Sequence, residues 1–231
     1  VVPPLLFTLS RGSYLAFFPA VIAMAWFAPW GRKIIPILIL LVAVLSIPFM
    51  PDTVRRRVEY TFKGRTTYTL PSFGVQDSQV SLDKSSVARL QTWETVMGYW
   101  MQYPILGLGI TGAGFIDSQW MRTVGELGLI GILAVIWLFR TVIANALRLY
   151  RAHYNRDDDL GFTIALGYLG GLVGLMIHAV TANTFYIVRI MGPFWFFTGL
   201  IVILQKFEAE RLADETAAEE APANPQRLAV L

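Results

Sequence analysis

Five stretches of the chain are long and apolar enough to cross a lipid bilayer, and they constrain the fold more than any other feature. A membrane-spanning helix needs about 20 consecutive, mostly apolar residues, and its backbone must bond internally because the hydrocarbon holds no water. The stretches occupy residues 13–30, 34–50, 123–146, 161–182 and 187–204. The sequence therefore predicts an all-α, polytopic transmembrane helical bundle.

Composition supports a membrane environment. Of the 231 residues, 55% are hydrophobic and only 15% are charged, which is more apolar than a soluble domain of this size can bury in one core. The formal net charge of +3 is too small to indicate a nucleic-acid partner. Cysteine is absent, so disulfides, thiolate zinc sites and a cysteine nucleophile are excluded. The apolar start at Val1 resembles the end of an earlier span, and we expect the chain to be the carboxy-terminal part of a longer protein.

The chain divides into four expected segments. The first two spans form a hairpin, because only Gly31, Arg32 and Lys33 separate them. The end of the chain is acidic and alanine-rich, which predicts a helical stub followed by disorder. The segments are a transmembrane hairpin (1–50), a long loop with an amphipathic helix (51–120), three transmembrane helices (121–205) and a disordered cytoplasmic tail (206–231).

The short loops predict the orientation. Basic residues in short loops favour the cytoplasmic side, which places the turn at Arg32 and Lys33, the 148–156 loop and the tail there. The long loop is then periplasmic. Ionisable residues inside spans usually face a polar cavity or a partner. Four of them fall at the outer ends of the spans and predict an outward-facing anionic site: Arg11, Arg122, His178 and Arg189.

The long loop is itself basic. A simple count of positive charge would place it inside, but long loops translocate largely regardless of charge. Arg57 is the member that we include among the candidate phosphate-binding residues. The seven basic residues are Arg55, Arg56, Arg57, Lys63, Arg65, Lys84 and Arg89.

An amphipathic helix is predicted from Ser85 onward, in the sequence SSVARLQTW and the residues after it. Arg89 lies within it. One interpretation is an interfacial helix anchored by aromatic residues, with Arg89 extended toward the headgroups. The other is a helix over the site, whose Arg89 guanidinium matches paired phosphate oxygens. The apolar and aromatic residues at helical spacing are Val87, Leu90, Trp93, Val96, Met97 and Trp100.

Residues 107–112 match the GxGxxG pattern of dinucleotide-binding proteins. That interpretation requires a preceding strand and a βαβ unit, whereas this segment leads into membrane spans. We therefore interpret its glycines, with Gly114, as a tight turn that lets backbone approach backbone or ligand.

Two carboxylates and one histidine are candidates for acid–base chemistry. Asp117 precedes an expected helix, so it is either the helix N-cap or a general base. Glu126 is its alternative, although its spacing of four from Arg122 favours a simple ion pair within the helix. His178 lies in a glycine-rich span, where a hydrogen bond to a neighbouring helix is the alternative to catalysis. No clustered histidines support a metal site, and no cofactor is implied.

Several short motifs occur in an order that resembles a known family. They are SRGSYLAF at Ser10, PDTVRRRVEY at Pro51, SSVARLQTW at Ser85, PILGLG at Pro104 and ELGLIG at Glu126. This ordered set, over roughly residues 8–140, resembles the O-antigen ligase and polymerase (Wzy/WaaL-like) superfamily of bacterial membrane glycosyltransferases.

The resemblance implies a function. Such enzymes transfer a glycan from an undecaprenyl-pyrophosphate carrier onto an acceptor sugar hydroxyl at the periplasmic face of the bacterial inner membrane, without an essential metal. Arg11 and Arg89 correspond to arginines that hold the pyrophosphate. Ligases usually carry a histidine ahead of the ELG motif, where this chain has Asp117, Ser118 and Gln119. The resemblance therefore favours a polymerase over a ligase.

The resulting hypothesis combines these residues. Arg11 and Arg89 clamp the diphosphate, Asp117 is the base, and Arg122, His178 and Arg189 line the site. The expected partners are the lipid-linked donor glycan, an acceptor glycan and the lipid bilayer. Two other classes stay open: a multi-span transporter or flippase of lipid-linked glycans, and a scaffold whose basic loop binds anionic headgroups.

Overall fold

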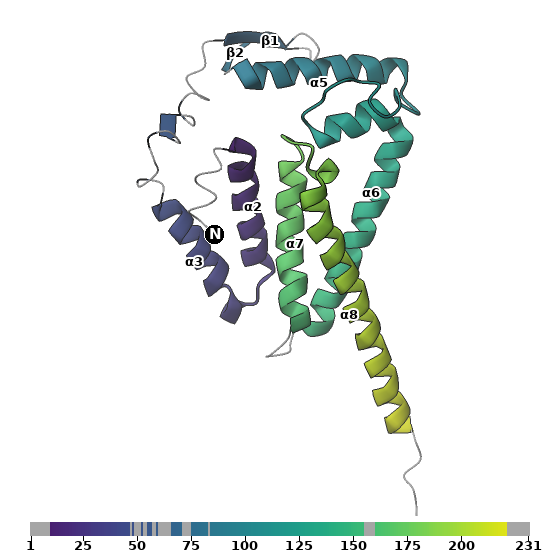
Figure 1. The fold of residues 1–231 in the computed structure, drawn as a ribbon. Helices are drawn as coiled ribbons and strands as arrows, with labels where there is room; N and C mark the ends of the chain where they lie inside the picture. The colour runs from purple at the N-terminus through teal and green to yellow at the C-terminus, as the bar shows by residue number, and fades with distance from the viewer. Residues whose placement is uncertain are drawn as a thin grey trace, which may run out of the picture.

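The computed structural model describes residues 10–46, 48, 52, 55–56, 59, 66–70, 75–82, 84–154 and 160–220, without the side chains of residues 11, 66–82 and 218–220. Three long helices form its centre (Figure 1). They are α6 (Gln119–His153), α7 (Leu160–His178) and α8 (Val188–Glu220), with the 3₁₀ turn η4 (Thr184–Tyr186) between the last two.

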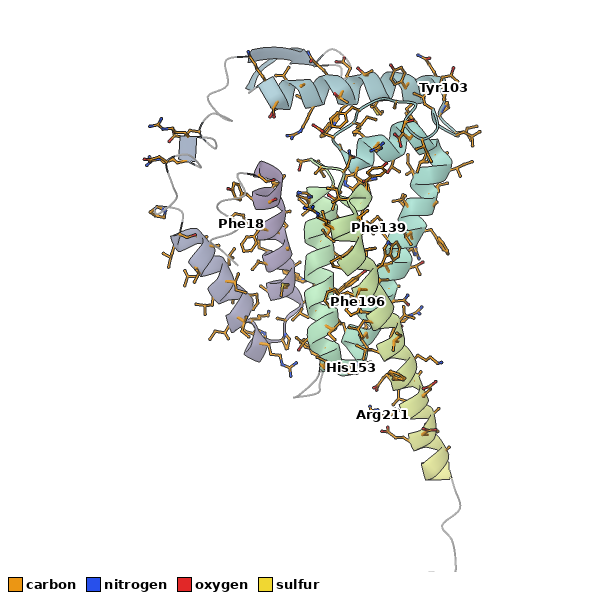
Figure 2. The ribbon with its side chains drawn as sticks, viewed as in Figure 1. Phe18, Tyr103, Phe139, His153, Phe196 and Arg211 are labelled. Atoms are coloured by element: carbon orange, nitrogen blue, oxygen red, sulfur yellow. The ribbon has the colours of Figure 1, made fainter. Side chains whose placement is uncertain are left out.

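The three helices share a core of aliphatic and aromatic side chains. Near one end, Ala146 and Leu149 of α6 pack with Leu169 of α7 and Ile201 of α8. Further along, Phe139 of α6 lies between the helices against Phe194 of α8 (Figure 2). Many of the large apolar side chains elsewhere on these helices are exposed, as expected where the surrounding solvent is lipid.

A helical hairpin lies beside this core. It consists of α2 (Arg11–Phe27) and α3 (Ile34–Leu45), joined by the 3₁₀ turn η1 (Trp30–Arg32). Gly170 and Gly174 of α7 face Ala20 of α2, where a Cβ on Gly174 would lie 3.0 Å from the Cβ of Ala20. Small residues thus allow close packing of α7 against α2. The sequence α2, η1 and α3 occupies the range of the expected hairpin.

The helix lengths agree in part with the five expected spans. Helices α6, α7 and α8 are each long and apolar enough to cross a membrane. The 17 residues of α2 and the 12 residues of α3 fall below the full length of about 20 residues. The predicted class, a helical membrane protein, is confirmed.

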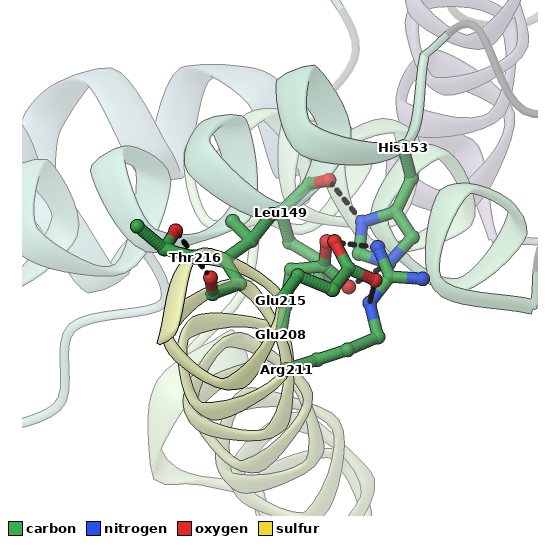
Figure 3. Close-up of polar contacts among 7 residues, drawn as sticks. Leu149, His153, Glu208, Arg211, Glu215 and Thr216 are labelled. Carbon is green, nitrogen blue, oxygen red and sulfur yellow. Dashed lines mark hydrogen bonds and ion pairs between the residues drawn. The ribbon is translucent and has the colours of Figure 1, made fainter. Parts of the chain in front are cut away.

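One end of the bundle brings together the turn η1, the last turns of α6 and the part of α8 where the tail begins. The Tyr150 hydroxyl donates to the carbonyl of Phe27, and the Arg32 guanidinium lies 4.7 Å from the centre of the Phe162 ring. His153 Nε2 lies 3.5 Å from Glu208 Oε2 (Figure 3). We call this end of the bundle the tail end. Its contacts agree with the prediction that these parts of the chain share one side of the membrane.

Helix α8 extends well past the tail end and ends at Glu220 (Figure 1). The helical stub expected after residue 206 is therefore the distal part of α8. Glu208 also pairs with Arg211 at 2.8 Å on this extension. Residues 221–231, where disorder is expected, lie outside the described residues.

The opposite end is covered by helix α5 (Lys84–Gln102), which runs across the end of the bundle and packs on α6 (Figure 1). The predicted amphipathic helix is confirmed, and its own Val87 and Val96 are buried. An antiparallel hairpin of β1 (Thr66–Leu70) and β2 (Val75–Leu82) precedes α5, pairing Thr66 with Leu82. This hairpin was not predicted from the sequence. We call this the α5 end.

Candidate functional site

The site begins with the docking of α5 onto the first turns of α6. Val96, only 1% exposed, lies against Gly125, where a Cβ would approach its Cγ1 to 2.9 Å. A larger residue at position 125 would therefore push α5 away. Because α5 carries Arg89 and α6 begins next to Asp117, this contact sets the distance between the two residues.

Helix α6 breaks at Gly128, where φ is 60° and ψ is −157°. Such a break frees backbone groups that need new partners inside a membrane. The loop after α5 supplies them: the N–H groups of Leu129 and Ile130 donate to the carbonyls of Pro104 and Ile105 at 2.9 and 3.2 Å. The broken helix is therefore satisfied by loop backbone.

The same loop also donates hydrogen bonds to α6, at the residues just before the break. The N–H groups of Leu108 and Gly109 reach the carbonyls of Gly125 and Glu126, both at 2.9 Å. Gly107, with φ of 67°, lies so close to α6 that a Cβ would stand 2.6 Å from the Glu126 carbonyl. The predicted tight turn and close backbone approach are confirmed, and their target is α6.

Arg89 and Asp117 meet between α5 and the start of α6. Arg89 Nε lies 3.8 Å from Asp117 Oδ2, and the two side chains are 33% and 45% exposed. That distance is too long for a hydrogen bond, and Arg89 Nε is buried without one among the described residues. The pair is thus a loose ion pair, in which both groups can still bind a ligand.

Asp117 is not the N-cap of α6. The helix begins at Gln119 and its cap is Ser118, whose Oγ accepts from the N–H of Met121 at 3.4 Å. The capping interpretation of Asp117 is therefore wrong by one residue. Ser118 is buried and its hydroxyl also approaches the carbonyl of Ala179, which ties the start of α6 to the end of α7 and leaves the Asp117 carboxylate at the surface.

Arg122 and Glu126 form the predicted ion pair within α6. Arg122 Nε donates to Glu126 Oε1 at 3.0 Å, and the side chains are only 14% and 8% exposed. The same oxygen accepts from the backbone N–H of Thr111 at 3.0 Å. Thr111 has a φ of 65°, which is unusual for a residue with a side chain. The buried carboxylate therefore fastens the glycine-rich loop to α6.

His178 lies at the end of α7, close to the start of α2. Its Nδ1 is 2.7 Å from the hydroxyl of Thr184 in η4. A Cβ on Gly12 would come within 3.5 Å of its Cδ2. The hydrogen-bond partner of His178 was predicted on a neighbouring helix, and in the structure it is Thr184, six residues further along the chain in η4. His178 lies where α2, α7 and η4 meet.

Of the other candidate arginines, the structure describes only some in full. Arg11 is the first residue of α2, next to Gly12 and so at the α5 end, but its side chain lies outside the described residues. Arg57 also lies outside them. Arg189 is exposed in the first turn of α8. The prediction that Arg11 joins Arg89 on a shared ligand stays a prediction.

Two parts of this arrangement were missed by sequence reasoning. The break at Gly128 has a weak signal, because two glycine-containing motifs, PILGLG and ELGLIG, lie close together in the chain. Asn183, Thr184 and Tyr186 fall in the short gap between two expected spans. Their polar character was the available signal: Asn183 Nδ2 donates to the carbonyl of Ile116 at 2.7 Å, beside Asp117.

The part of the chain that the structure describes contains no cluster of metal-ligating side chains. No three histidine, aspartate or glutamate side chains there lie together as a metal ion would require. The polar groups that do converge at the α5 end are guanidinium groups, carboxylates and one imidazole, which suit an anionic ligand and proton transfer.

Together these features define a helical membrane protein with a charged site beneath a covering amphipathic helix. Residues 5–136 match the family model described as O-antigen ligase. The match spans more than half of the chain, and the chain belongs to the O-antigen ligase family, a group of membrane enzymes of the ligase and polymerase type. No curated protein and no solved structure matches it.

Proposed function

We propose that this chain carries the site of a membrane glycosyltransferase that polymerises or transfers a glycan from an undecaprenyl-pyrophosphate carrier to an acceptor sugar hydroxyl at the periplasmic face. The observation that carries the proposal is the loose Arg89–Asp117 pair, with Arg89 Nε 3.8 Å from Asp117 Oδ2. A diphosphate requires a cation and an attacking hydroxyl requires a base, and these two residues offer both at one surface.

In the proposed reaction, the acceptor oxygen attacks the anomeric carbon of the donor glycan. The bond from that carbon to the diphosphate oxygen breaks, and the hydroxyl proton passes to the carboxylate of Asp117. The charge left on the diphosphate is met by Arg89, with Arg11 and Arg189 as further cations at the same end. Correctly placed donors of this kind are worth about 100- to 1,000-fold in rate.

The carboxylates divide into two roles. Glu126 already accepts from Arg122 and from Thr111 and is nearly fully buried. Asp117 is half exposed and is not used as a helix cap. We therefore assign the base to Asp117, and give Glu126 and Arg122 a positioning role that holds the loop. His178 is the second candidate for proton transfer.

Apolar cavities near the site suit the isoprenoid part of the carrier. One of about 320 Å³ is lined by Gln119, Trp120 and Thr123 of α6, together with Phe185 and Trp195. Three of its lining residues belong to the same first turns of α6 as Arg122. An isoprenoid chain has only apolar surface, so its burial there is favoured by the hydrophobic effect.

The transporter alternative also has a structural feature to consider, because broken helices are common at transport sites. At Gly128, however, the freed N–H and carbonyl groups are occupied by the loop around Pro104 and Gly107. They are not left open toward a substrate. The break in α6 therefore holds the loop in place, which favours an enzyme over a transporter.

The test is chain-length analysis of the surface polysaccharide in a strain that lacks the gene and is complemented with variants. Arg89→Ala and Asp117→Ala should each abolish long chains while the protein remains in the membrane. Matched controls are Arg148→Ala and Asp214→Ala, near the tail end and on the α8 extension, which should restore the wild-type pattern. Wild-type banding from both site variants would contradict the proposal.

A further inference from the structure

The short turn η4 between two membrane spans is held by contacts of two of its three residues. Thr184 is fully buried and its hydroxyl meets His178 Nδ1 at 2.7 Å. Phe185 packs against Phe139, with ring centres 4.8 Å apart. The two residues that precede Tyr186 are therefore fixed into the bundle from two sides.

Tyr186 itself faces outward from this anchored turn. The residue is 65% exposed, although a tyrosine ring is largely apolar. The Arg122 guanidinium lies 4.6 Å from the ring centre, and Arg122 is in turn held by Glu126 at 3.0 Å. A nearly buried ion pair thus supports the ring from one side and leaves much of it accessible.

One hydrogen bond ties the turn that carries this ring to the segment that leads into Asp117. Asn183, three residues before Tyr186, donates from Nδ2 to the carbonyl of Ile116 at 2.7 Å. Ile116 is buried and is the neighbour of Asp117 in the chain. The turn that carries Tyr186 and the segment that carries Asp117 are therefore directly joined.

A supported, accessible aromatic face is what a sugar ring binds. One face of a pyranose consists of C–H groups with small positive partial charge, which are attracted to the negative face of an aromatic ring. The ring needs a fixed plane, because ordering a free side chain would offset the gain. The arrangement of η4, Arg122 and Glu126 provides that plane, in a turn that is hydrogen-bonded to the residue before the candidate base.

We infer that Tyr186 is a stacking platform for a pyranose ring of the glycan, placing a sugar next to Asp117. This inference rests on the proposed function, since it names a subsite for the same substrate. Arg122 then serves to orient Tyr186 and does not bind diphosphate. The competing explanation is that Tyr186 anchors the protein in the headgroup region, as interfacial aromatic residues do.

The experiment measures sugar binding without the diphosphate. The purified full chain in lipid nanodiscs is titrated with the repeat-unit oligosaccharide released by mild acid from the host's lipid-linked glycan, and binding is followed by saturation-transfer difference NMR. Tyr186→Leu, which keeps an apolar side chain but no flat face, should weaken binding about three- to tenfold. Tyr186→Phe should bind like wild type, because the ring face and not the hydroxyl is used.

The matched control is Tyr103→Leu, directly after α5 and also exposed (Figure 2). It should leave binding unchanged. Equal weakening by both leucine variants, wild-type binding by Tyr186→Leu, or a loss with Tyr186→Phe would each overturn the platform. Tyr186→Met, checked for unchanged thermal unfolding, repeats the test with a second flexible side chain and must weaken binding as leucine does.

This result is independent of the transfer reaction. If Arg89→Ala and Asp117→Ala abolish long chains while Tyr186→Leu binds the oligosaccharide normally, only the platform is wrong. If those two variants keep activity while Tyr186→Leu loses the oligosaccharide, the platform stands and the proposed diphosphate chemistry is wrong.

Discussion

Gly107 and Gly128 lie back to back where the loop after α5 crosses the break in α6, and a Cβ on Gly128 would stand only 2.5 Å from the Gly107 nitrogen. Both residues have positive φ, 67° and 60°. The crossing holds Thr111 within reach of Glu126 and α5 within reach of Asp117. The charged site thus depends on a contact between two residues that have no side chain.

Gly128→Ala should destabilise the protein. The backbone conformation at Gly128 is accessible essentially only to glycine, and strain of this kind costs about 1–3 kcal/mol before any clash with Gly107. Thermal unfolding in detergent, followed by tryptophan fluorescence, should show a clear drop in Tm. The control is Gly199→Ala in α8, where no atom lies within 4 Å of the new Cβ; it should be neutral or slightly stabilising. An unchanged Tm for Gly128→Ala would show that the crossing is not needed for stability.

Glu126→Ala should clearly lower the thermal stability of the protein. Its effect on the turnover per folded molecule should be smaller. Removing the carboxylate leaves Arg122 buried without its partner, a change that costs about 3 kcal/mol. Glu126→Gln should lose less, because its amide oxygen still accepts from Thr111. The measurement compares Tm with the turnover per folded molecule. A Glu126→Gln protein that is stable but inactive would transfer the role of base from Asp117 to Glu126.

Arg89→Lys should reduce activity although the charge is kept. A lysine ammonium is a point charge that cannot reproduce the paired donors of a guanidinium. Losing one hydrogen bond to a charged group costs about 1.5–3 kcal/mol, or about ten- to hundredfold in rate. The control is Arg55→Lys, in the exposed Arg55–Glu59 pair, which should be silent. If Arg89→Lys is silent as well, the residue serves only as a charge at the membrane surface.

His153→Ala should loosen the α8 extension at the tail end. Nδ1 donates to the Leu149 carbonyl at 3.0 Å, and Nε2 lies 3.5 Å from Glu208 in a largely buried pair (Figure 3). Hydrogen exchange of backbone amides in residues 206–217 should become faster. Lys206→Ala, which removes only an exposed pair with Glu210, should leave exchange unchanged, since exposed pairs contribute little. Equal exchange in both variants would show that the His153–Glu208 contact does not hold the extension.

Much of the architecture follows from patterns with a regular period. Runs of apolar residues predict α6, α7 and α8, and helical spacing predicts α5 with Val87 and Val96 as its buried face. The i, i+4 spacing also predicts the Arg122–Glu126 pair. Each of these depends only on residues near one another in the chain, so local physics is enough to find them.

A helical membrane protein, the loop helix that bears Arg89 and the glycine-rich turn can all be predicted from the amino-acid sequence, because hydrophobic length and helical period are local properties. The folded bundle was needed to show that this turn bonds to a broken α6, that Ser118 and not Asp117 caps the helix, and that Tyr186 is supported by Arg122. These relationships join α5, α6 and η4, and a contact between separate elements has no period along the chain. It depends on which surfaces pack together once the bundle has formed.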